Sequence, residues 1–163
     1  MLSARMQKAL NDQINFELYS AYIYLSMSAW FESKNLKGSA HWMRVQTKEE
    51  MGHAMKIYDF VVKRLGVVTL AAIKGPETAW PSAMAIFQEA FKHEQIVTKR
   101  INALVELARK EQDNASDIFL QWFVNEQVEE EEQTDEIVQK LKMIKDSTNG
   151  LLMLDHQLAK RAA

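Results

Sequence analysis

The stretch Glu49-Glu50-Met51-Gly52-His53 places two carboxylates and an imidazole in the middle of a long helical pattern. Glu50 and His53 are three residues apart, so their side chains share one face of a helix. The rest of that face is apolar and is formed by Met43, Ile57 and Phe60. A carboxylate on a core-facing stripe costs on the order of several kcal/mol unless a partner compensates its charge. A bound cation is one such partner, but Glu-x-x-His also occurs by chance on solvated helices. The interpretation therefore depends on whether other helices supply matching groups.

Length and composition limit the classes of protein to consider. The chain has 163 residues, enough for one domain with a sizeable core. A net charge of −2 gives no argument for nucleic-acid binding, and the lack of cysteine excludes disulfides, thiolate metal sites and iron–sulfur clusters. No apolar signal segment follows the N-terminus, and no apolar run approaches the ~18 residues of a membrane span. We therefore expect no membrane or nucleic-acid partner, and a cytoplasmic location.

The pattern of apolar residues predicts an all-α chain with one domain over residues 1–163. Glycine and proline are sparse, and both prolines lie in a single connection. Ser39 and Ser82 are suitable N-caps, and Gly66 stands where a C-cap glycine belongs. Helices are expected at about residues 4–33, 39–65, 82–110 and 116–145, with a crossover at 66–81 and a short fifth helix at 151–160.

The connection at residues 66–81 decides the topology. Its sixteen residues reach roughly 50 Å when fully extended, whereas a helix of ~28 residues is roughly 42 Å long. The third helix is therefore expected to run parallel to the second, while the short breaks before the second and fourth helices predict antiparallel neighbours. The leucine-rich segment at 151–158 would be a sticky patch if exposed, so we expect it to pack against partner subunits.

Each of the four long helices carries an apolar seam that polar residues interrupt near its midpoint. The interruptions are Glu17 and Tyr24 in the first helix, Glu50 and His53 in the second, Glu94 in the third, and Gln127 and Glu130 in the fourth. Because midpoints lie at the same height whichever way a helix runs, these groups are expected to converge at one level of the core. Four buried carboxylates and one imidazole require roughly two divalent cations for charge balance, and such ligands suit iron or manganese better than a structural zinc site.

Several segments closely resemble the bacterial non-haem ferritins. They are Asn15-Phe16-Glu17-Leu18-Tyr19-Ser20, Glu49-Glu50-Met51-Gly52-His53, Phe119-Leu120-Gln121-Trp122 and Asn125-Glu126-Gln127. The resemblance covers essentially the whole chain. It implies a ferritin-like four-helix bundle with one long crossover connection and a short fifth C-terminal helix.

The resemblance also implies a role for each polar group of the seams. One iron would be held by Glu17, Glu50 and His53, and a second by Glu50, Glu94 and Glu130, with Glu50 bridging. Gln127 would orient a ligand or a water, and Tyr24 would hydrogen-bond a ligand and serve as a transient electron donor. A third iron site would be formed by Glu49, Glu126 and Glu129. His41, His93 and His156 are expected to be non-ligands, and Glu131 and Glu132 to be solvated.

The sequence departs from related patterns at a few positions. The fourth helix offers Gln127-x-x-Glu130, whereas bacterioferritins carry a second Glu-x-x-His. Met51 lies where bacterioferritins place a haem-binding methionine, but the asymmetric pair argues against haem, so we expect no haem and a packing role for Met51. Asp117 matches one acid of the three-fold channel of animal ferritins and Leu120 replaces the other, which puts iron movement by that route in doubt.

The resemblance implies an iron-storage protein with ferroxidase activity. It would oxidise Fe²⁺ with O₂ or H₂O₂ and store a ferric mineral inside a homo-oligomeric cage of 24 subunits. The alternative is a non-storing di-iron oxidase or peroxidase, although the rubrerythrin type needs cysteines that the chain lacks. A purely structural bundle with a polar layer is also open and predicts no stoichiometric iron binding. A mini-ferritin that coats DNA is disfavoured because there is no basic tail.

Overall fold

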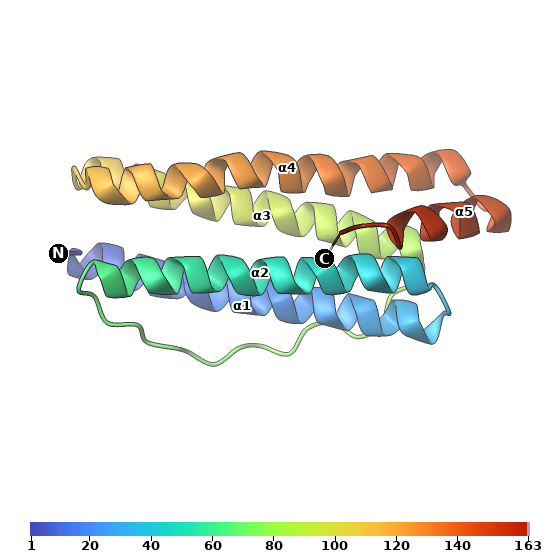
Figure 1. The fold of residues 1–163 in the computed structure, drawn as a ribbon, viewed down its shortest axis with the longest axis horizontal. Coiled ribbons are helices and arrows are strands. Elements are labelled where there is room, and N and C mark those ends of the chain that lie inside the picture. Colours follow the sequence, from blue (N-terminus) through green and yellow to red (C-terminus); the bar gives the residue numbers. More distant parts are fainter. Residues whose placement is uncertain (163) are drawn as a thin grey trace.

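The computed structural model describes residues 1–162 and confirms the all-α fold class (Figure 1). Its five helices are α1 (Ala4–Ser33), α2 (Lys37–Lys63), α3 (Ala83–Lys110), α4 (Asn114–Ile144) and α5 (Thr148–Leu158). The four long helices form a bundle, and α5 lies across one end of it. Among residues 1–162, no helix combines the length and the hydropathy that crossing a bilayer requires.

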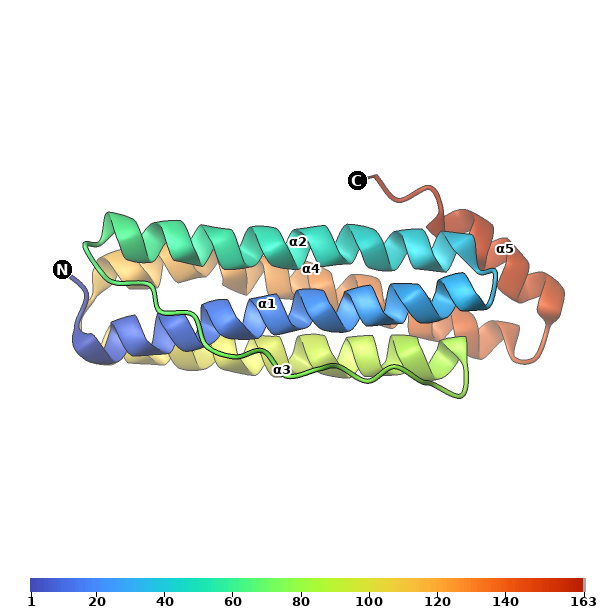
Figure 2. The same cartoon turned by 90° about the horizontal axis from the view of Figure 1, so that it is seen from below.

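The crossover between α2 and α3 runs along the whole bundle beside α1, so that α2 and α3 point the same way (Figure 2). Polar side chains at every fourth position of α1 form hydrogen bonds with the backbone of the first part of the crossover. The hydrogen bonds join Gln7 to the amide of Val67, Asn11 to the backbone of Val67 and Thr69, and Asn15 to the carbonyl of Ala72. These amide groups satisfy backbone groups that no helix or sheet pairs, which is how an extended connection stays ordered.

Helix ends follow local chemistry and correct some expected boundaries. Ser82 caps α3 as predicted, since its hydroxyl accepts from the amide of Ala85 at 3.1 Å. Asp113 caps α4, which therefore begins at Asn114 and not at 116, and Ser147 caps α5, which begins at Thr148 and not at 151. The expected end of α2 at residue 65, with Gly66 as the C-cap glycine, was also wrong. The helix ends at Lys63, and Leu65, with φ 59°, takes the left-handed conformation expected of Gly66.

The start of α2 shows why Ser39 was the wrong N-cap. The helix already begins at Lys37, and the Asp155 carboxylate of α5 accepts from the amides of Gly38 at 3.0 Å and Ser39 at 2.7 Å. An anion from a distant element thus satisfies the free amides and complements the helix dipole. The α5 backbone approaches so closely that a Cβ at Gly38 would lie 1.7 Å from the carbonyl oxygen of Asp155. Glycine is therefore required at this position.

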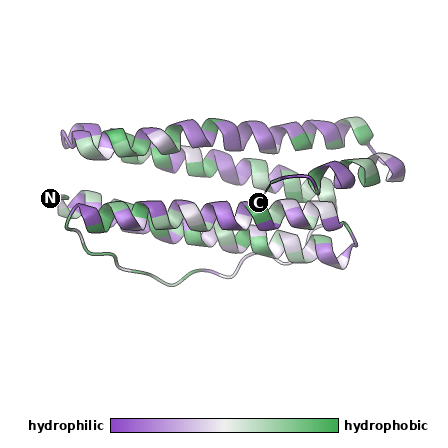
Figure 3. Cartoon of the chain, in the orientation of Figure 1, coloured by the Kyte–Doolittle hydropathy of each residue, from purple (hydrophilic) through white to green (hydrophobic). Residues whose placement is uncertain are grey.

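The core consists of two apolar clusters separated by a polar layer. The cluster nearer α5 includes Phe31, Met43 and Phe87, and the other includes Leu10, Ile57 and Phe123. Between them, polar side chains of all four long helices are buried: Glu17, Gln46, Glu50, His53, Glu94, Gln127 and Glu130. Figure 3 shows that α4 is mainly hydrophilic along its length. Gln127 and Glu130 of this helix nevertheless lie inside the bundle and are at most 3 % exposed.

Candidate metal centre

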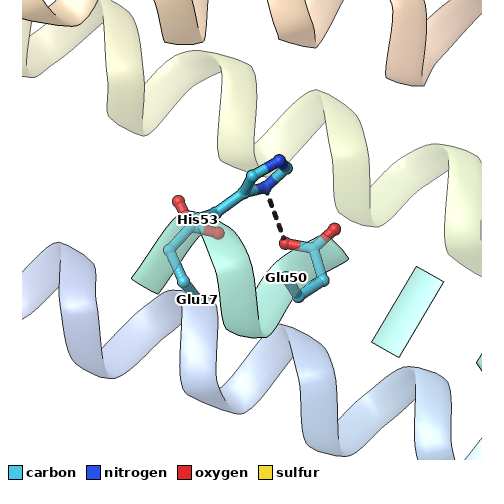
Figure 4. A group of neighbouring side chains, drawn as sticks. All are labelled: Glu17, Glu50 and His53. Carbon is cyan, nitrogen blue, oxygen red and sulfur yellow. Dashed lines mark ion pairs between the residues drawn. The ribbon is translucent and has the colours of Figure 1, made fainter. Parts of the chain in front are cut away.

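Three predicted ligands meet in the middle of the bundle. Glu17 reaches in from α1 and Glu50 and His53 from adjacent turns of α2 (Figure 4). One ligand atom from each residue lies within 4.8 Å of the others, and none of the three residues is more than 5 % exposed. The Nδ1 atom of His53 lies 3.4 Å from Oε2 of Glu50. Two oxygens and one nitrogen at this spacing are a suitable donor set for a divalent transition metal.

Two carboxylate oxygens of this group have no hydrogen-bond partner. Oε2 of Glu17 and Oε2 of Glu50 are both buried, and neither accepts a hydrogen bond from the described residues. Buried polar atoms in native proteins are normally paired, because an unpaired one keeps the full cost of its lost hydration. The remaining oxygens are occupied, since Gln13 donates to Oε1 of Glu17 at 2.8 Å and Gln46 to Oε1 of Glu50 at 3.0 Å. The unpaired oxygens are thus the positions that a cation would fill.

The third and fourth helices supply a second group of carboxylates, Glu94 and Glu130, and both oxygens of Glu94 accept hydrogen bonds. Tyr24 donates its hydroxyl to Oε1 of Glu94, and Gln127 donates to Oε2 of Glu94 at 3.1 Å. Gln46 donates to Oε2 of Glu130 at 2.7 Å and so links Glu130 to Glu50. Tyr24 and Gln127 therefore both contact Glu94, whose role as a ligand stays a prediction. The second donor set of Glu50, Glu94 and Glu130 stays a prediction, because the described residues do not bring its three ligand atoms as close as those of the first set.

Burial raises the pKa of all four carboxyl groups. The pKa values of Glu17 and Glu50 lie well above 4.5, first because of lost hydration and then because neighbouring carboxylates repel the charge. Lost hydration also raises the pKa of Glu94, although the hydrogen bonds from Tyr24 and Gln127 act in the opposite direction. Lost hydration and the charge of Glu94 bring the pKa of Glu130 to about 8. Glu130 is therefore largely protonated at neutral pH when no cation is present, and a divalent cation bound by its carboxylate would displace this proton.

The structure separates the three residues predicted for a third iron site. Glu126 faces the centre, with its Oε1 atom 3.7 Å from Nε2 of His53, and it groups with His53 and Glu130 within 4.8 Å. Glu49 instead pairs with Arg161 of the C-terminal segment, and Glu129 is exposed. A site made of Glu49, Glu126 and Glu129 therefore stays a prediction that needs the Glu49–Arg161 pair to open.

Three residues that were predicted not to bind metal can be compared with the structure. His93 is buried and hydrogen-bonded to Ser20 at 2.7 Å, and burial lowers its pKa to about 4, which agrees with a neutral, non-ligating ring. Met51 is 44 % exposed, so the expected packing role was wrong. Glu131 is half-buried and accepts a hydrogen bond from Thr98, so its expected solvation was wrong as well.

Sequence reasoning missed the groups that hold the ligands. Gln13 was missed although it stands four residues before Glu17, which is a recognisable helical spacing. Arg100, which donates to Gln13 at 2.9 Å, and Arg161 lie 87 and 112 residues from their partners. No local pattern could have indicated these two contacts.

Comparisons with known proteins identify chains that are similar over nearly the whole length. The family model described as ferritin-like domain matches residues 7–144. A bacterial non-heme ferritin of Bacteroides fragilis is 42 % identical over 161 residues, covering 99 % of this chain and 100 % of that protein. A bacterial non-heme ferritin of Campylobacter jejuni is 39 % identical over 158 residues, covering 97 % of this chain and 95 % of that protein. A solved open pore ferritin from the hyperthermophilic archaeon Archaeoglobus fulgidus is 51 % identical, covers 99 % of this chain and 100 % of that chain, and superposes with a TM-score of 0.99.

Proposed function

The chain belongs to the ferritin family, and from this premise we propose that it oxidises Fe²⁺ to Fe³⁺ and stores the ferric product as a mineral. The observation that carries the proposal is the pair of buried, unpaired oxygens on Glu17 and Glu50 beside the His53 imidazole. Buried carboxylates are costly to ionise without a partner, and a divalent cation between Glu17, Glu50 and His53 would stabilise their ionised form. Iron is the substrate here, not a resident cofactor, and no haem is part of the proposal.

The oxidation needs two irons held close together. Two Fe²⁺ ions supply two electrons, and one O₂ accepts them together with two protons to give H₂O₂ and two Fe³⁺. We assign the first iron to Glu17, Glu50 and His53, and the second to Glu50, Glu94 and Glu130. Tyr24 and Gln127 would orient Glu94 through the hydrogen bonds described above. Oxygen-rich ligation favours the harder Fe³⁺ product, which is the direction that the reaction requires.

Storage requires a shell, and the proposal includes a homo-oligomeric cage of 24 subunits in the cytoplasm. Apolar side chains that a monomer leaves open support an assembly of some kind. On α5, Leu152 and Met153 are 54 % and 75 % exposed, and on the crossover Leu70 is 63 % exposed. Patches of this kind on a stable protein usually mark contacts with other chains.

The experiment adds Fe²⁺ to metal-free protein in air, follows the ferric absorbance and then sizes the product. The expected result is fast oxidation and a large particle that retains iron. Glu50→Ala should remove the fast phase, whereas Glu132→Ala, a change at an exposed acid of α4, should retain it. Oxidation no faster than in buffer would refute the ferroxidase activity. Fast oxidation with no retained iron would instead support a non-storing di-iron oxidase.

A further inference from the structure

A pocket of about 350 Å³ opens between α3 and α4 next to the buried centre. Its polar lining comes from Thr98, Asn102, Gln127 and Glu131, and no lysine or arginine lines it. Gln127 belongs both to this lining and to the polar layer of the core, where it is 3 % exposed. The pocket therefore ends at a residue that also contacts Glu94.

A continuous series of polar contacts joins the mouth of the pocket to Glu94. Thr98 donates its hydroxyl to Oε1 of Glu131 at 2.5 Å, and Gln127 reaches Oγ1 of Thr98 at 3.4 Å. Gln127 also donates to Oε2 of Glu94 at 3.1 Å and to the Glu94 carbonyl at 3.2 Å. The series thus runs from the half-exposed carboxylate of Glu131 through the Thr98 hydroxyl and the Gln127 amide group to the buried carboxylate of Glu94.

The orientation of Gln127 is fixed by its neighbours. Each atom that its Nε2 contacts is an acceptor, so the NH₂ group must face Glu94 and Thr98. The carbonyl oxygen Oε1 accepts no hydrogen bond from the described residues, although the side chain is almost fully buried. This oxygen is the one polar atom of Gln127 left for a ligand in the pocket, and a carbonyl oxygen binds a cation or a water that hydrates it.

We infer that this pocket is the access site for divalent iron, with Glu131 capturing the hydrated ion and Gln127 passing it to Glu94. The inference rests on the proposed function, because it supplies a route to the proposed centre. The ligands of that centre are at most 5 % exposed, so a metal ion needs a path through the side chains. A negative pocket with no cationic lining raises the local concentration of cations and speeds their arrival.

The test compares Glu131→Gln with Glu132→Gln, its exposed neighbour on the same helix. Glu131→Gln keeps an acceptor for Thr98 but removes the charge. The rate of Co²⁺ binding without oxygen, followed by its visible absorbance, should fall about tenfold in Glu131→Gln and stay unchanged in Glu132→Gln. In air, Glu131→Gln should raise the Fe²⁺ concentration for half-maximal oxidation and leave the rate at saturation unchanged.

A bulky substitution in the pocket tests the access route independently. Val128 lines the pocket and is 66 % exposed, so Val128→Trp adds bulk at the mouth without disturbing the core. It should slow Co²⁺ binding while the final amount bound stays the same. Wild-type binding rates in both Glu131→Gln and Val128→Trp would overturn the access route. The proposed function would still stand if these variants oxidised iron normally, whereas no oxidation by the wild-type protein would refute that function separately.

Discussion

The two halves of the polar layer differ in how their carboxylates are satisfied. In the open half, formed by α1 and α2, Glu17 and Glu50 each keep one buried oxygen without a partner. In the closed half, formed by α3 and α4, both oxygens of Glu94 accept hydrogen bonds, from Tyr24 and Gln127, and Glu130 accepts one from Gln46. Glu94, with both oxygens hydrogen-bonded, is therefore stabilised in the metal-free state, whereas Glu17 and Glu50 each keep an oxygen for a cation.

This difference predicts an order of metal binding. A cation entering the open half gains two free oxygens and one imidazole nitrogen without displacing a hydrogen bond. A cation entering the closed half must exchange or share hydrogen bonds that already stabilise the carboxylates, and each of these is worth about 1.5–3 kcal/mol when the acceptor is charged. Preorganised donors bind more tightly than donors that must rearrange. The first ion is therefore expected between Glu17, Glu50 and His53.

The largest effect is expected from removing a carboxylate of the open half. Glu17→Ala should abolish the first binding step, because even residues that only orient a ligand are worth about 10–100-fold in metal affinity. Glu94→Ala should leave the first step in place and remove the second. Titration with Co²⁺ without oxygen, followed by visible absorbance, distinguishes the two variants. Loss of the same step in both variants would show that the halves bind metal as one unit.

The next effect is a dependence of stability on pH in the metal-free protein. Glu130 has its pKa raised from 4.5 to about 8 by burial and by Glu94, so the folded state binds the proton more tightly than the unfolded state. Its contribution is fully present below pH 4.5 and is lost as the pH rises to about 8. At ~1.4 kcal/mol per pKa unit this amounts to at most roughly 5 kcal/mol.

Glu130→Gln provides the measurement, because glutamine keeps the shape and does not ionise. In urea unfolding, the stability of Glu130→Gln relative to the wild type should increase from pH 4.5 to pH 8. Glu132→Gln, at an exposed position, should show no such trend. A constant difference between Glu130→Gln and the wild type across this range would mean that Glu130 is ionised throughout.

Removing a hydrogen bond from the closed half should have a smaller effect on stability and on metal affinity. Tyr24→Phe removes the hydroxyl that donates to Glu94 and should lower the stability of the metal-free protein by about 1–3 kcal/mol. Because a carboxylate oxygen is then free, the affinities of the two binding steps should approach each other. Calorimetric titration with Co²⁺ measures both steps. Unchanged separation of the steps would show that the hydrogen bond of Tyr24 does not set the order.

The open half was predictable from the sequence, and much of the closed half's environment was not. Glu50 and His53 interrupt an apolar stripe at helical spacing, so their position in the core follows from periodicity. The orientation of each carboxylate depends on donors from other helices. Gln46 could be placed on the stripe, but its bond to Glu130 spans 84 residues. Arg161 contacts Glu49 only because α5 turns the chain back along α2, and no local signal contains that path.

The smallest effect on stability is expected from the ion pair between Arg161 and Glu49, which lies outside both halves. Arg161 pairs with Glu49 and lies over the Trp42 ring, with its guanidinium carbon 4.2 Å from the ring centre. Since the Glu49 side chain is 40 % exposed, the ion pair is expected to contribute no more than ~1 kcal/mol to stability.

Arg161→Ala should therefore barely change the melting temperature, yet free the Glu49 carboxylate for a cation shared with Glu126 or Glu129. Co²⁺ titration should then reveal one additional weak site in Arg161→Ala, whereas Arg161→Lys, which keeps the charge, should bind as the wild type does. An unchanged number of sites in Arg161→Ala would show that freeing the Glu49 carboxylate does not create a site shared with Glu126 or Glu129.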